Sequence, residues 1–345
     1  MKPTIKDVAK KSGFSITSVS QVLNNKPNAI PNQSKAKIID AAKELNYRPN
    51  RLAVSLVTKS TKVLGLVIPD NSNLFFSELS KSIEVAARKK GYSIIYGNTN
   101  NESFRDIEYL HLFVDLQVDG IIVTKASSLN VEEDIENLSF LENVRKPYVI
   151  VDRPTQGIES NLVYVDNVVG GELATQHLLD LGHTKIGCFT GPHNLVNSEL
   201  RLEGYKKAIQ QAGLDYDPRF IFEGNFSMGL ESAAMDHFLK EKVSAVFCFN
   251  DIMAFGLYRE AAHRGINIPN DLSIVGYDNV QLADIVYPGL STIHQPIDEI
   301  GEEAVKMLAT VIEETKKDTK HIQTKTLKPT LVLRGSTRHL ERKSS

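Results

Sequence analysis

The sequence predicts an α/β protein in which a small helical N-terminal unit precedes a two-lobed body with parallel sheets. Three short amphipathic helices are expected within the first 48 residues. From residue 63 onward, apolar strands alternate with helices, and the alternation restarts near residue 162. Continuously apolar strands that alternate with helices are typical of a parallel sheet covered on both faces, so two such sets in series predict two lobes.

The N-terminal unit begins with two short helices joined by a tight turn. Thr4 and Asp7 have the spacing of a capping box, which predicts a helix that starts at Ile5. Gly13 ends this helix, and Ser15 is the expected cap of the next one. In the second helix the apolar residues recur at helical spacing and the polar residues face outward: Val19, Val22 and Leu23 are apolar, and Thr17, Ser18 and Gln21 are polar.

A third helix is expected after a cap at Ser34, with core positions Ile38, Ala41, Ala42 and Leu45. Two short helices around a turn that contains Gly, closed by a third, are typical of a helix-turn-helix, whose second helix enters the major groove of DNA. An ordinary helical bundle would show the same pattern, but charge favours DNA binding. Residues 1–62 contain 12 Lys/Arg and 3 Asp/Glu, whereas the remainder contains 28 and 39. A basic unit on an acidic body is typical of phosphate binding.

The segments Thr4–Ser15, Thr17–Asn24 and Glu44–Ala53 resemble, in order and almost without gaps, the DNA-binding head of the lactose and galactose repressor (LacI/GalR) family. In such a head Ile16 can contact a thymine methyl group and Gln21 can pair with adenine. Many relatives have Arg at the Gln21 position, so their operators are not transferred to this chain. The resemblance implies that the DNA contacts are Thr4, Ile16, Thr17, Gln21, Asn24, Asn50, Arg51 and Leu56.

The segment from Asn50 to Val57 resembles the hinge helix of the same family. That helix folds when two subunits meet on the operator, and it inserts a Leu into the minor groove. Leu56 matches this residue, and an apolar wedge between base steps kinks DNA. A plain linker with one apolar residue is the alternative. The resemblance favours the wedge.

Length and composition fit a small head on a two-lobed body. The chain has 345 residues, 41% of them hydrophobic, which suffices for more than one core. The N-terminus lacks an apolar run and no stretch approaches the ~20 apolar residues of a membrane span, so we expect a cytoplasmic protein without a signal peptide or membrane segment. Cys188 and Cys248 lie in apolar runs and fit no metal-ligand spacing, which predicts reduced core thiols and no metal site.

Two sets of strands and helices are expected in the body. The first set has strands at 63–68, 93–96, 120–124 and 148–151 and helices at 75–90, 102–117 and 132–141. The second set has strands at 163–165, 186–189, 245–249 and 273–275 and helices at 170–181, 200–212, 227–239 and 252–264. Two similar lobes predict a cleft between them, with ligand groups on the loops at the carboxyl ends of the strands.

The body resembles the type I periplasmic sugar-binding fold, which serves as the regulatory domain of the same family. In that fold the chain crosses between the lobes three times. The resemblance therefore implies a head (1–48), a hinge helix and linker (49–62), a first lobe (63–161 with 292–321) and a second lobe (162–291 with 322–340). The final strand, Leu327 to Leu333, is assigned to the second lobe.

The loops of the expected cleft carry the two kinds of side chain that a sugar requires. Forked polar groups can donate to and accept from hydroxyls, and Phe rings cover C–H faces. Residue by residue, these loops look like the ribose-binding members of the fold. The matching positions are Asn73, Phe75, Phe76, Asp152, Arg153, Arg201, Phe226, Asn250, Asp278 and Gln295. The resemblance implies D-ribose or a close pentose, while another sugar, a nucleoside and a phosphorylated ligand stay open.

A glycosidase and a transport binding protein are the two rival classes of protein. Asp152 and Asp278 could be the paired carboxylates of a glycosidase, but the sequence has no nucleophile elbow, Walker loop, H-E-x-x-H or G-x-G-x-x-G motif. We therefore expect no enzyme and no cofactor. A transport binding protein is disfavoured by the basic head and the missing signal peptide.

The sequence is interpreted as a ligand-controlled transcriptional repressor, similar to ribose operon repressors, that binds double-stranded operator DNA as a homodimer. We expect D-ribose to act as an inducer that releases DNA. Members similar to the purine repressor respond in the opposite direction, so control by a corepressor is the alternative. The short polar tail after Leu333 has no room for a tetramerising coiled coil.

Overall fold

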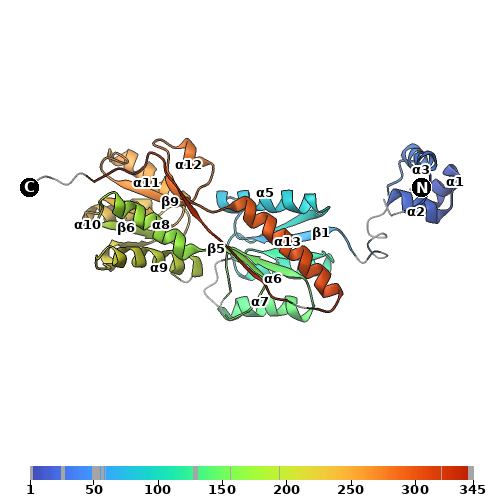
Figure 1. The fold of residues 1–345 in the computed structure, drawn as a ribbon, viewed down its shortest axis with the longest axis horizontal. Coiled ribbons are helices and arrows are strands. Elements are labelled where there is room, and N and C mark those ends of the chain that lie inside the picture. Colours follow the sequence, from blue (N-terminus) through green and yellow to red (C-terminus); the bar gives the residue numbers. More distant parts are fainter. Residues whose placement is uncertain are drawn as a thin grey trace, which may run out of the picture. The chain divides into compact units, whose positions relative to one another are not determined.

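The fold was analysed in a computed structural model that describes residues 3–24, 28–48, 55, 58, 60–126, 131–155, 157–193, 195–319 and 321–340 (Figure 1). Contacts between residues divide the chain into two compact units, Met1–Thr61 and Lys62–Ser345. The first unit contains the residues of the expected head and most of the expected hinge and linker, and the second contains those of the expected body.

Residues 3–24 and 28–48 form three helices, α1 (Ile5–Ser12), α2 (Ile16–Leu23) and α3 (Asn32–Glu44). The Asp7 carboxylate accepts hydrogen bonds from the Thr4 backbone N–H and hydroxyl, each at 2.8 Å, which confirms the expected start of α1. Gly13 ends α1 with a left-handed φ of 76°. The Ser15 hydroxyl oxygen accepts the Ser18 backbone N–H at 3.1 Å and caps α2. These local signals fix the turn between the first two helices.

The third helix begins earlier than the sequence predicted. Pro31, and not Ser34, precedes its first turn, and the Pro31 carbonyl accepts the Lys35 N–H at 3.0 Å. Proline is favourable near a helix start because the first N–H groups need no partner within the helix. The core of the head contains the expected positions Val19, Val22, Ile38, Ala41 and Ala42, together with Val8 and Ala9 of α1.

The body contains two six-stranded sheets. The first sheet has the order β11-β5-β4-β3-β1-β2 and the second has the order β12-β10-β9-β8-β6-β7. The strands of the first sheet are β1 (Val63–Ile68), β2 (Ser93–Asn98), β3 (Gly120–Val123), β4 (Tyr148–Val151), β5 (Leu162–Val165) and β11 (Thr324–Leu327). Those of the second are β6 (Ile186–Thr190), β7 (Ile221–Glu223), β8 (Ala245–Cys248), β9 (Ser273–Asp278), β10 (Ser291–His294) and β12 (Thr330–Val332). All pairings are parallel except that of β10 with β12.

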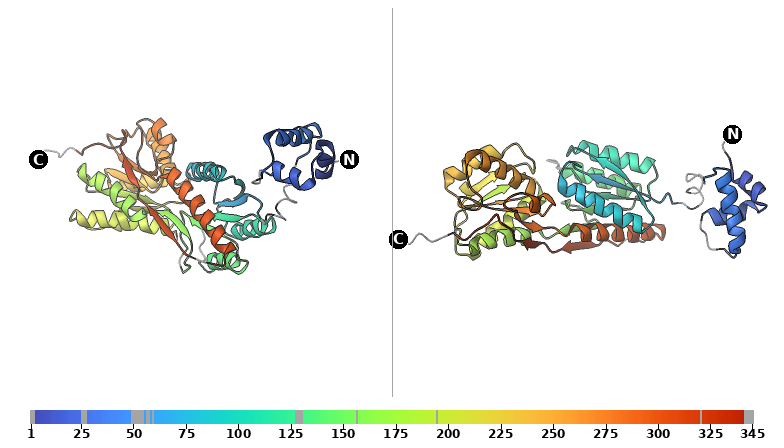
Figure 2. Two further views of the ribbon diagram at one scale, coloured as in Figure 1. Left: turned by 45° about the vertical axis from the view of Figure 1, so that its right-hand side comes forward. Right: turned by 90° about the horizontal axis from the view of Figure 1, so that it is seen from above.

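Helices cover both sheets, as the views in Figure 2 show. The helices that pack with the first sheet are α5 (Leu74–Lys89), α6 (Phe104–Asp115), α7 (Val131–Asn143) and α13 (Ile297–Lys316). Those of the second sheet are α8 (Asn167–Asp180), α9 (Val196–Gln211), α10 (Glu231–Glu241) and α11 (Asp251–Arg264), and a short helix, α12 (Leu282–Ile285), follows β9. The two-lobed α/β fold predicted from the sequence is confirmed.

Five strands differ from the sequence-based assignment: β7 and β10 were not predicted, and β5, β11 and β12 were assigned differently. Residues 292–294, expected in the first lobe, belong to β10 of the second sheet. Leu162–Val165, expected to open the second lobe, instead pairs with β4 and β11 in the first sheet. The expected final strand, Leu327 to Leu333, is two strands in different sheets, separated by Lys328 and Pro329. Proline has no N–H for the ladder and interrupts a strand. The chain therefore passes from the first sheet to the second after β5, returns to the first with α13 and crosses again after β11.

The remaining expectations about the body concern membranes and thiols. Within the part of the chain that the structure describes, no helix is long and apolar enough to cross a membrane. Cys188 and Cys248 are buried and unpaired, as expected, and burial raises the pKa of both thiols.

Candidate functional site

The outward face of α2 presents the residues expected to contact DNA. Ile16 has 45% of its surface exposed although it is apolar, and Thr17 beside it is also exposed. Gln21 is half-buried one turn further along, and Thr4 is exposed at the start of α1. For an exposed Ile at the start of a helix, contact with a base methyl group is more favourable than contact with water.

Of the other expected DNA contacts, Asn24 lies within the described residues. The Asn24 side-chain amide donates to the Ser20 carbonyl at 2.9 Å, so this amide is engaged in ending α2. Asn50, Arg51 and Leu56 lie outside the described residues.

The ten residues expected to bind a sugar gather where the strands of both sheets end, and we call them the interlobe cluster. On the first sheet they follow β4 or lie at the start of α5 after β1, and on the second they end β9, follow β8 and β10, or lie on α9 and on the loop after β7. The cluster consists of Asn73, Phe75, Phe76, Asp152, Arg153, Arg201, Phe226, Asn250, Asp278 and Gln295.

The part of the cluster on the first sheet combines an aromatic pair with an acid and a base. The Phe75 and Phe76 rings meet edge to face with centroids 5.2 Å apart. The Arg153 guanidinium lies 5.1 Å from the centre of the Phe76 ring, and its Nε is 3.9 Å from the Asp152 carboxylate. Asn73 caps α5, because its Oδ1 accepts the Phe75 N–H at 3.0 Å.

On the second sheet, Arg201 is held by three neighbours. Its guanidinium stacks 3.6 Å from the centre of the Tyr277 ring, its Nε donates to Asn167 Oδ1 at 2.7 Å, and it also donates to the Phe249 carbonyl. The Phe226 ring lies 5.7 Å from the same guanidinium. Fixed in this way, Arg201 presents a rigid planar donor with little conformational entropy left to lose.

The other members on the second sheet are linked to one another. Gln295 Nε2 donates to Asp278 Oδ1 at 2.7 Å. Asn250 Nδ2 donates to the Phe226 carbonyl at 2.9 Å, and its Oδ1 accepts the Met253 N–H at 3.0 Å, so this residue caps α11 as well.

A hydrogen bond joins the two parts of the cluster. Asn197 on α9 donates from Nδ2 to the Asp152 carboxylate at 3.1 Å. Burial raises the pKa of Asp152, and Arg153 and Arg201 oppose that rise. Burial also raises the pKa of Asp278 well above its usual range, with Arg201 acting against it. Both carboxylates therefore share the field of Arg201, which places the ends of the two sheets within electrostatic reach of each other.

Two features of the cluster are typical of binding sites. Asp152, Phe226 and Asp278 have left-handed φ values of 68°, 61° and 111°, which are strained for residues other than glycine. Several buried polar atoms near the cluster have no hydrogen-bond partner among the residues that the structure describes: Thr124 Oγ1, Thr190 Oγ1, Asn197 Oδ1, Ser198 Oγ and Gln295 Oε1. Buried polar groups are rarely left unpaired, so these atoms mark positions where a hydroxylated ligand or water completes the bonding.

Sequence reasoning missed the residues that support the cluster. Asn197 lies in the first turn of α9, and the predicted helix began only at Leu200. Asn167 Oδ1 accepts from both Arg201 and the Tyr277 hydroxyl. The exposed polar pattern of α9 gave no signal for Asn197, because only the fold brings it to Asp152.

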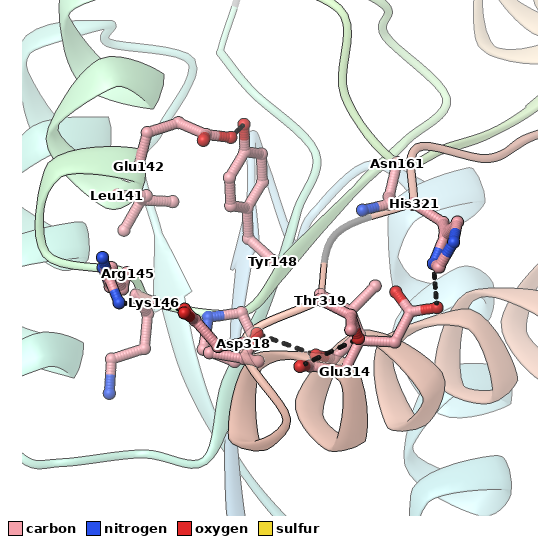
Figure 3. A pocket seen from close by; sticks show the side chains of 13 residues that line it. Leu141, Glu142, Arg145, Lys146, Tyr148, Asn161, Glu314, Asp318, Thr319 and His321 are labelled. Atoms are coloured by element: carbon pink, nitrogen blue, oxygen red, sulfur yellow. Dashed lines mark hydrogen bonds and ion pairs between the residues drawn. The ribbon is translucent and has the colours of Figure 1, made fainter.

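A separate cavity of about 270 Å³ lies at the amino ends of β4 and β5, against the end of α13 (Figure 3). Figure 3 shows Tyr148 pointing toward Glu142 and His321 toward Glu314, and the corresponding contacts are 2.9 and 3.0 Å. None of the interlobe cluster lines this cavity. Among the described residues, no group of three or more His, Cys, Asp or Glu side chains is arranged to hold a metal ion.

Comparison with known families matches both units. The family of bacterial regulatory proteins, lacI family, matches residues 4–50, and a periplasmic binding protein-like domain matches residues 175–337. The chain is 34% identical to the HTH-type transcriptional repressor PurR of Vibrio campbellii over 339 residues, which cover 98% of this chain and 99% of that protein. It is 37% identical to PurR of Vibrio atlanticus over 307 residues, which cover 88% and 90%.

Solved structures agree with this result. The lac repressor dimer bound to operator and the anti-inducer ONPF is 25% identical, with a TM-score of 0.85 over 98% of this chain and all of that chain. A LacI family regulator from Enterococcus faecium with bound ribose is 33% identical, with a TM-score of 0.71 over 81% of this chain and 100% of that chain.

A helix-turn-helix head in front of a two-lobed, ligand-binding type of body defines a transcriptional regulator that answers to a small molecule, and not an enzyme. The chain belongs to the LacI family and is a sequence-specific, DNA-binding transcriptional repressor.

Proposed function

We propose that the effector of this repressor is D-ribose, bound by the interlobe cluster. The observation that carries the proposal is the pairing of aromatic and forked polar groups around unsatisfied buried acceptors. Phe75 and Phe76 on one side and Phe226 on the other can cover the C–H faces of a ring. Two carboxylates and two guanidinium groups can then bind its hydroxyls, each of which donates and accepts.

The charge of the cluster favours a neutral ligand. Its ionisable members are Asp152 and Asp278 against Arg153 and Arg201, so their formal charges cancel. All four side chains are at least nine-tenths buried. A phosphorylated sugar would bring about two negative charges into this buried site beside two carboxyl groups, which desolvation would penalise.

Similarity to the ribose-bound regulator from Enterococcus faecium supports the same ligand, since 33% identity extends over all of that chain. The sign of the response is a second question. We infer induction, in which ribose lowers operator affinity. The similarity to PurR repressors, which spans 98% of the chain, favours the alternative that a corepressor raises it.

We also propose that the repressor acts as a homodimer. The loop around α12 exposes apolar side chains, with 73% of Ile285 and 96% of Tyr287 accessible. Such residues on one loop mark an interaction surface. A dimer would bring two heads to the halves of a palindromic operator, as in the lac repressor dimer with its operator.

Calorimetric titration with D-ribose tests the effector. Binding of ribose without binding of xylose, glucose, ribose 5-phosphate or a purine base is the expected result. Arg153→Ala should abolish the heat, because it removes a buried forked donor, whereas the exposed Arg145→Ala should bind ribose normally. Folded protein that gives no heat with ribose would disprove the assignment.

The sign of the response is tested by fluorescence anisotropy with labelled operator. Ribose should release the operator from the wild type but not from Arg153→Ala, which would therefore repress constantly. Tighter operator binding in the presence of ribose, or of a purine base, would favour the corepressor alternative.

A further inference from the structure

Behind the interlobe cluster lies a group of buried charges that sugar binding does not use directly. It consists of Asp106 on α6, Lys125 after β3 and Asp134 on α7, and it lies against Arg153 of the interlobe cluster. Asp106 and Asp134 are 3% and 5% exposed. Lys125 forms an ion pair with Asp134, which leaves Asp106 without a direct ionic partner among these groups.

Asp106 and Arg153 hold opposite sides of one peptide group. Arg153 donates to the Lys125 carbonyl at 2.9 Å, and the Ala126 N–H of the same peptide unit donates to Asp106 Oδ2 at 3.0 Å. Hydrogen bonds therefore link the Arg153 guanidinium, this peptide group and the Asp106 carboxylate in series. Hydrogen bonds in such a chain polarise one another, so a negative charge on Asp106 makes the Lys125 carbonyl a stronger acceptor for Arg153.

We propose that Asp106 is a positioning residue for the effector: when ionised it holds Arg153 toward the sugar through this peptide group, and when protonated it weakens that hold, so that effector affinity depends on pH. The inference rests on the proposed function of the interlobe cluster.

The surroundings of Asp106 allow its carboxyl group to gain or lose a proton near neutral pH. Burial raises the pKa of Asp106 to about 7; the Ala126 hydrogen bond, Arg153 and Lys125 oppose the rise and Asp134 adds to it. Its second oxygen, Oδ1, is buried and has no hydrogen-bond partner in the described chain. Protonation at Oδ1 therefore breaks no existing bond.

The direction of the effect follows from which group the ligand covers. Asp106 is already almost fully buried, so a ligand in the cluster can remove little more water from it. Arg153 would contact the bound ligand and lose its remaining contact with water. A negative charge close to the guanidinium then becomes more favourable. The bound state therefore favours ionised Asp106, a proton is released on binding, and affinity rises with pH.

Titration calorimetry of the full-length protein with D-ribose tests this coupling. Wild type should bind about 3- to 10-fold more weakly at about pH 6 than at about pH 8, since tenfold corresponds to one unit of change in pKa. In buffers of different ionisation enthalpy at neutral pH, it should release a fraction of a proton per ribose.

Asp106→Asn keeps an acceptor for the Ala126 N–H but cannot titrate. It should bind ribose at both pH values as weakly as wild type does at the lower one, with no proton release. The matched control is Asp115→Asn, an exposed acid on the same helix, which should behave as wild type. Thermal unfolding checks that Asp106→Asn is folded.

Pairs of outcomes separate this inference from the proposed function. Ribose affinity that does not change with pH in wild type, or that changes equally in Asp106→Asn, overturns the role of Asp106 alone. Absence of ribose binding at both pH values overturns the proposed effector and this inference with it.

Discussion

Asp278 is a residue of the cluster whose ionised form lowers the stability of the folded protein, although the residue is expected to bind the ligand. Its folded-state pKa is raised, so the folded protein holds the proton more tightly than the unfolded chain, and the ionised form destabilises the fold as pH rises above the unfolded value of about 4. Asp278→Asn should therefore be at least as stable as wild type at neutral pH, with the difference shrinking as pH falls. Thermal unfolding across pH measures this effect.

The same substitution should weaken ribose binding about 10-fold or more, because the Asn amide has one accepting oxygen where the Asp carboxyl group has two. Asn can still accept the 2.7 Å bond from Gln295 and tolerates the left-handed φ of 111°. If Asp278→Asn were less stable than wild type at neutral pH, and if its stability changed with pH as that of wild type does, the raised pKa of Asp278 would be contradicted.

At the residue scale, sequence similarity located the ten members of the cluster, and the structure brings them to the same edges of the two sheets. Sequence similarity could not reveal that Asn73 and Asn250 cap helices, or that Asn197 donates a hydrogen bond to Asp152. Helix caps and contacts between lobes depend on backbone positions that residues distant in sequence determine.

Among the elements, the packing of α8 on α9 determines the position of Arg201. Their backbones touch at glycines: a Cβ on Gly204 would lie 2.1 Å from the Val168 carbonyl oxygen. Gly204→Ala should lower the free energy of unfolding by about 1–3 kcal/mol, because the helices must separate. It should also weaken ribose binding, since α9 carries Arg201 and Asn197.

Chemical denaturation and calorimetry of Gly204→Ala check both effects. The neighbouring exposed Glu203→Ala serves as the control and should unfold as wild type does. Unchanged stability of Gly204→Ala would mean that α8 and α9 do not pack as closely as described.

Apolar periodicity predicted the long buried elements well, because β1, β3 and β4 are continuous hydrophobic runs. It failed for β7, β11 and β12, which are short, partly exposed strands at sheet edges. In such strands pairing comes from the neighbouring backbone, and the sequence carries little signal.

For the whole molecule, the contrast between the basic head and the acidic body predicts a difference in salt sensitivity. Operator affinity should fall by about 100-fold or more between about 50 and about 200 mM salt, because bound phosphates release counterions. Ribose affinity should change little, since the charges of the cluster are buried. Anisotropy measures operator affinity and calorimetry measures ribose affinity in the same salt series. Operator affinity that does not change with salt would contradict the charge argument.

The exposed loop around α12 leads to a prediction about assembly. Tyr287→Asp should shift the protein toward monomers and weaken operator binding, while ribose binding is retained. Sedimentation velocity measures the assembly state. Tyr96→Asp, which alters another exposed aromatic residue, tests whether the effect is specific to this loop. A dimer that survives Tyr287→Asp would place the interface elsewhere.

The three passages of the chain between the sheets also determine when each part can fold during synthesis. The three helices of the head are complete once Glu44 has left the ribosome. The first sheet lacks its last edge strand until Leu327 has been added, and the second waits for Val332. A growing chain therefore carries the three helices of the head long before either sheet is complete, and until then the unfinished sheets expose apolar surface and unpaired strand edges.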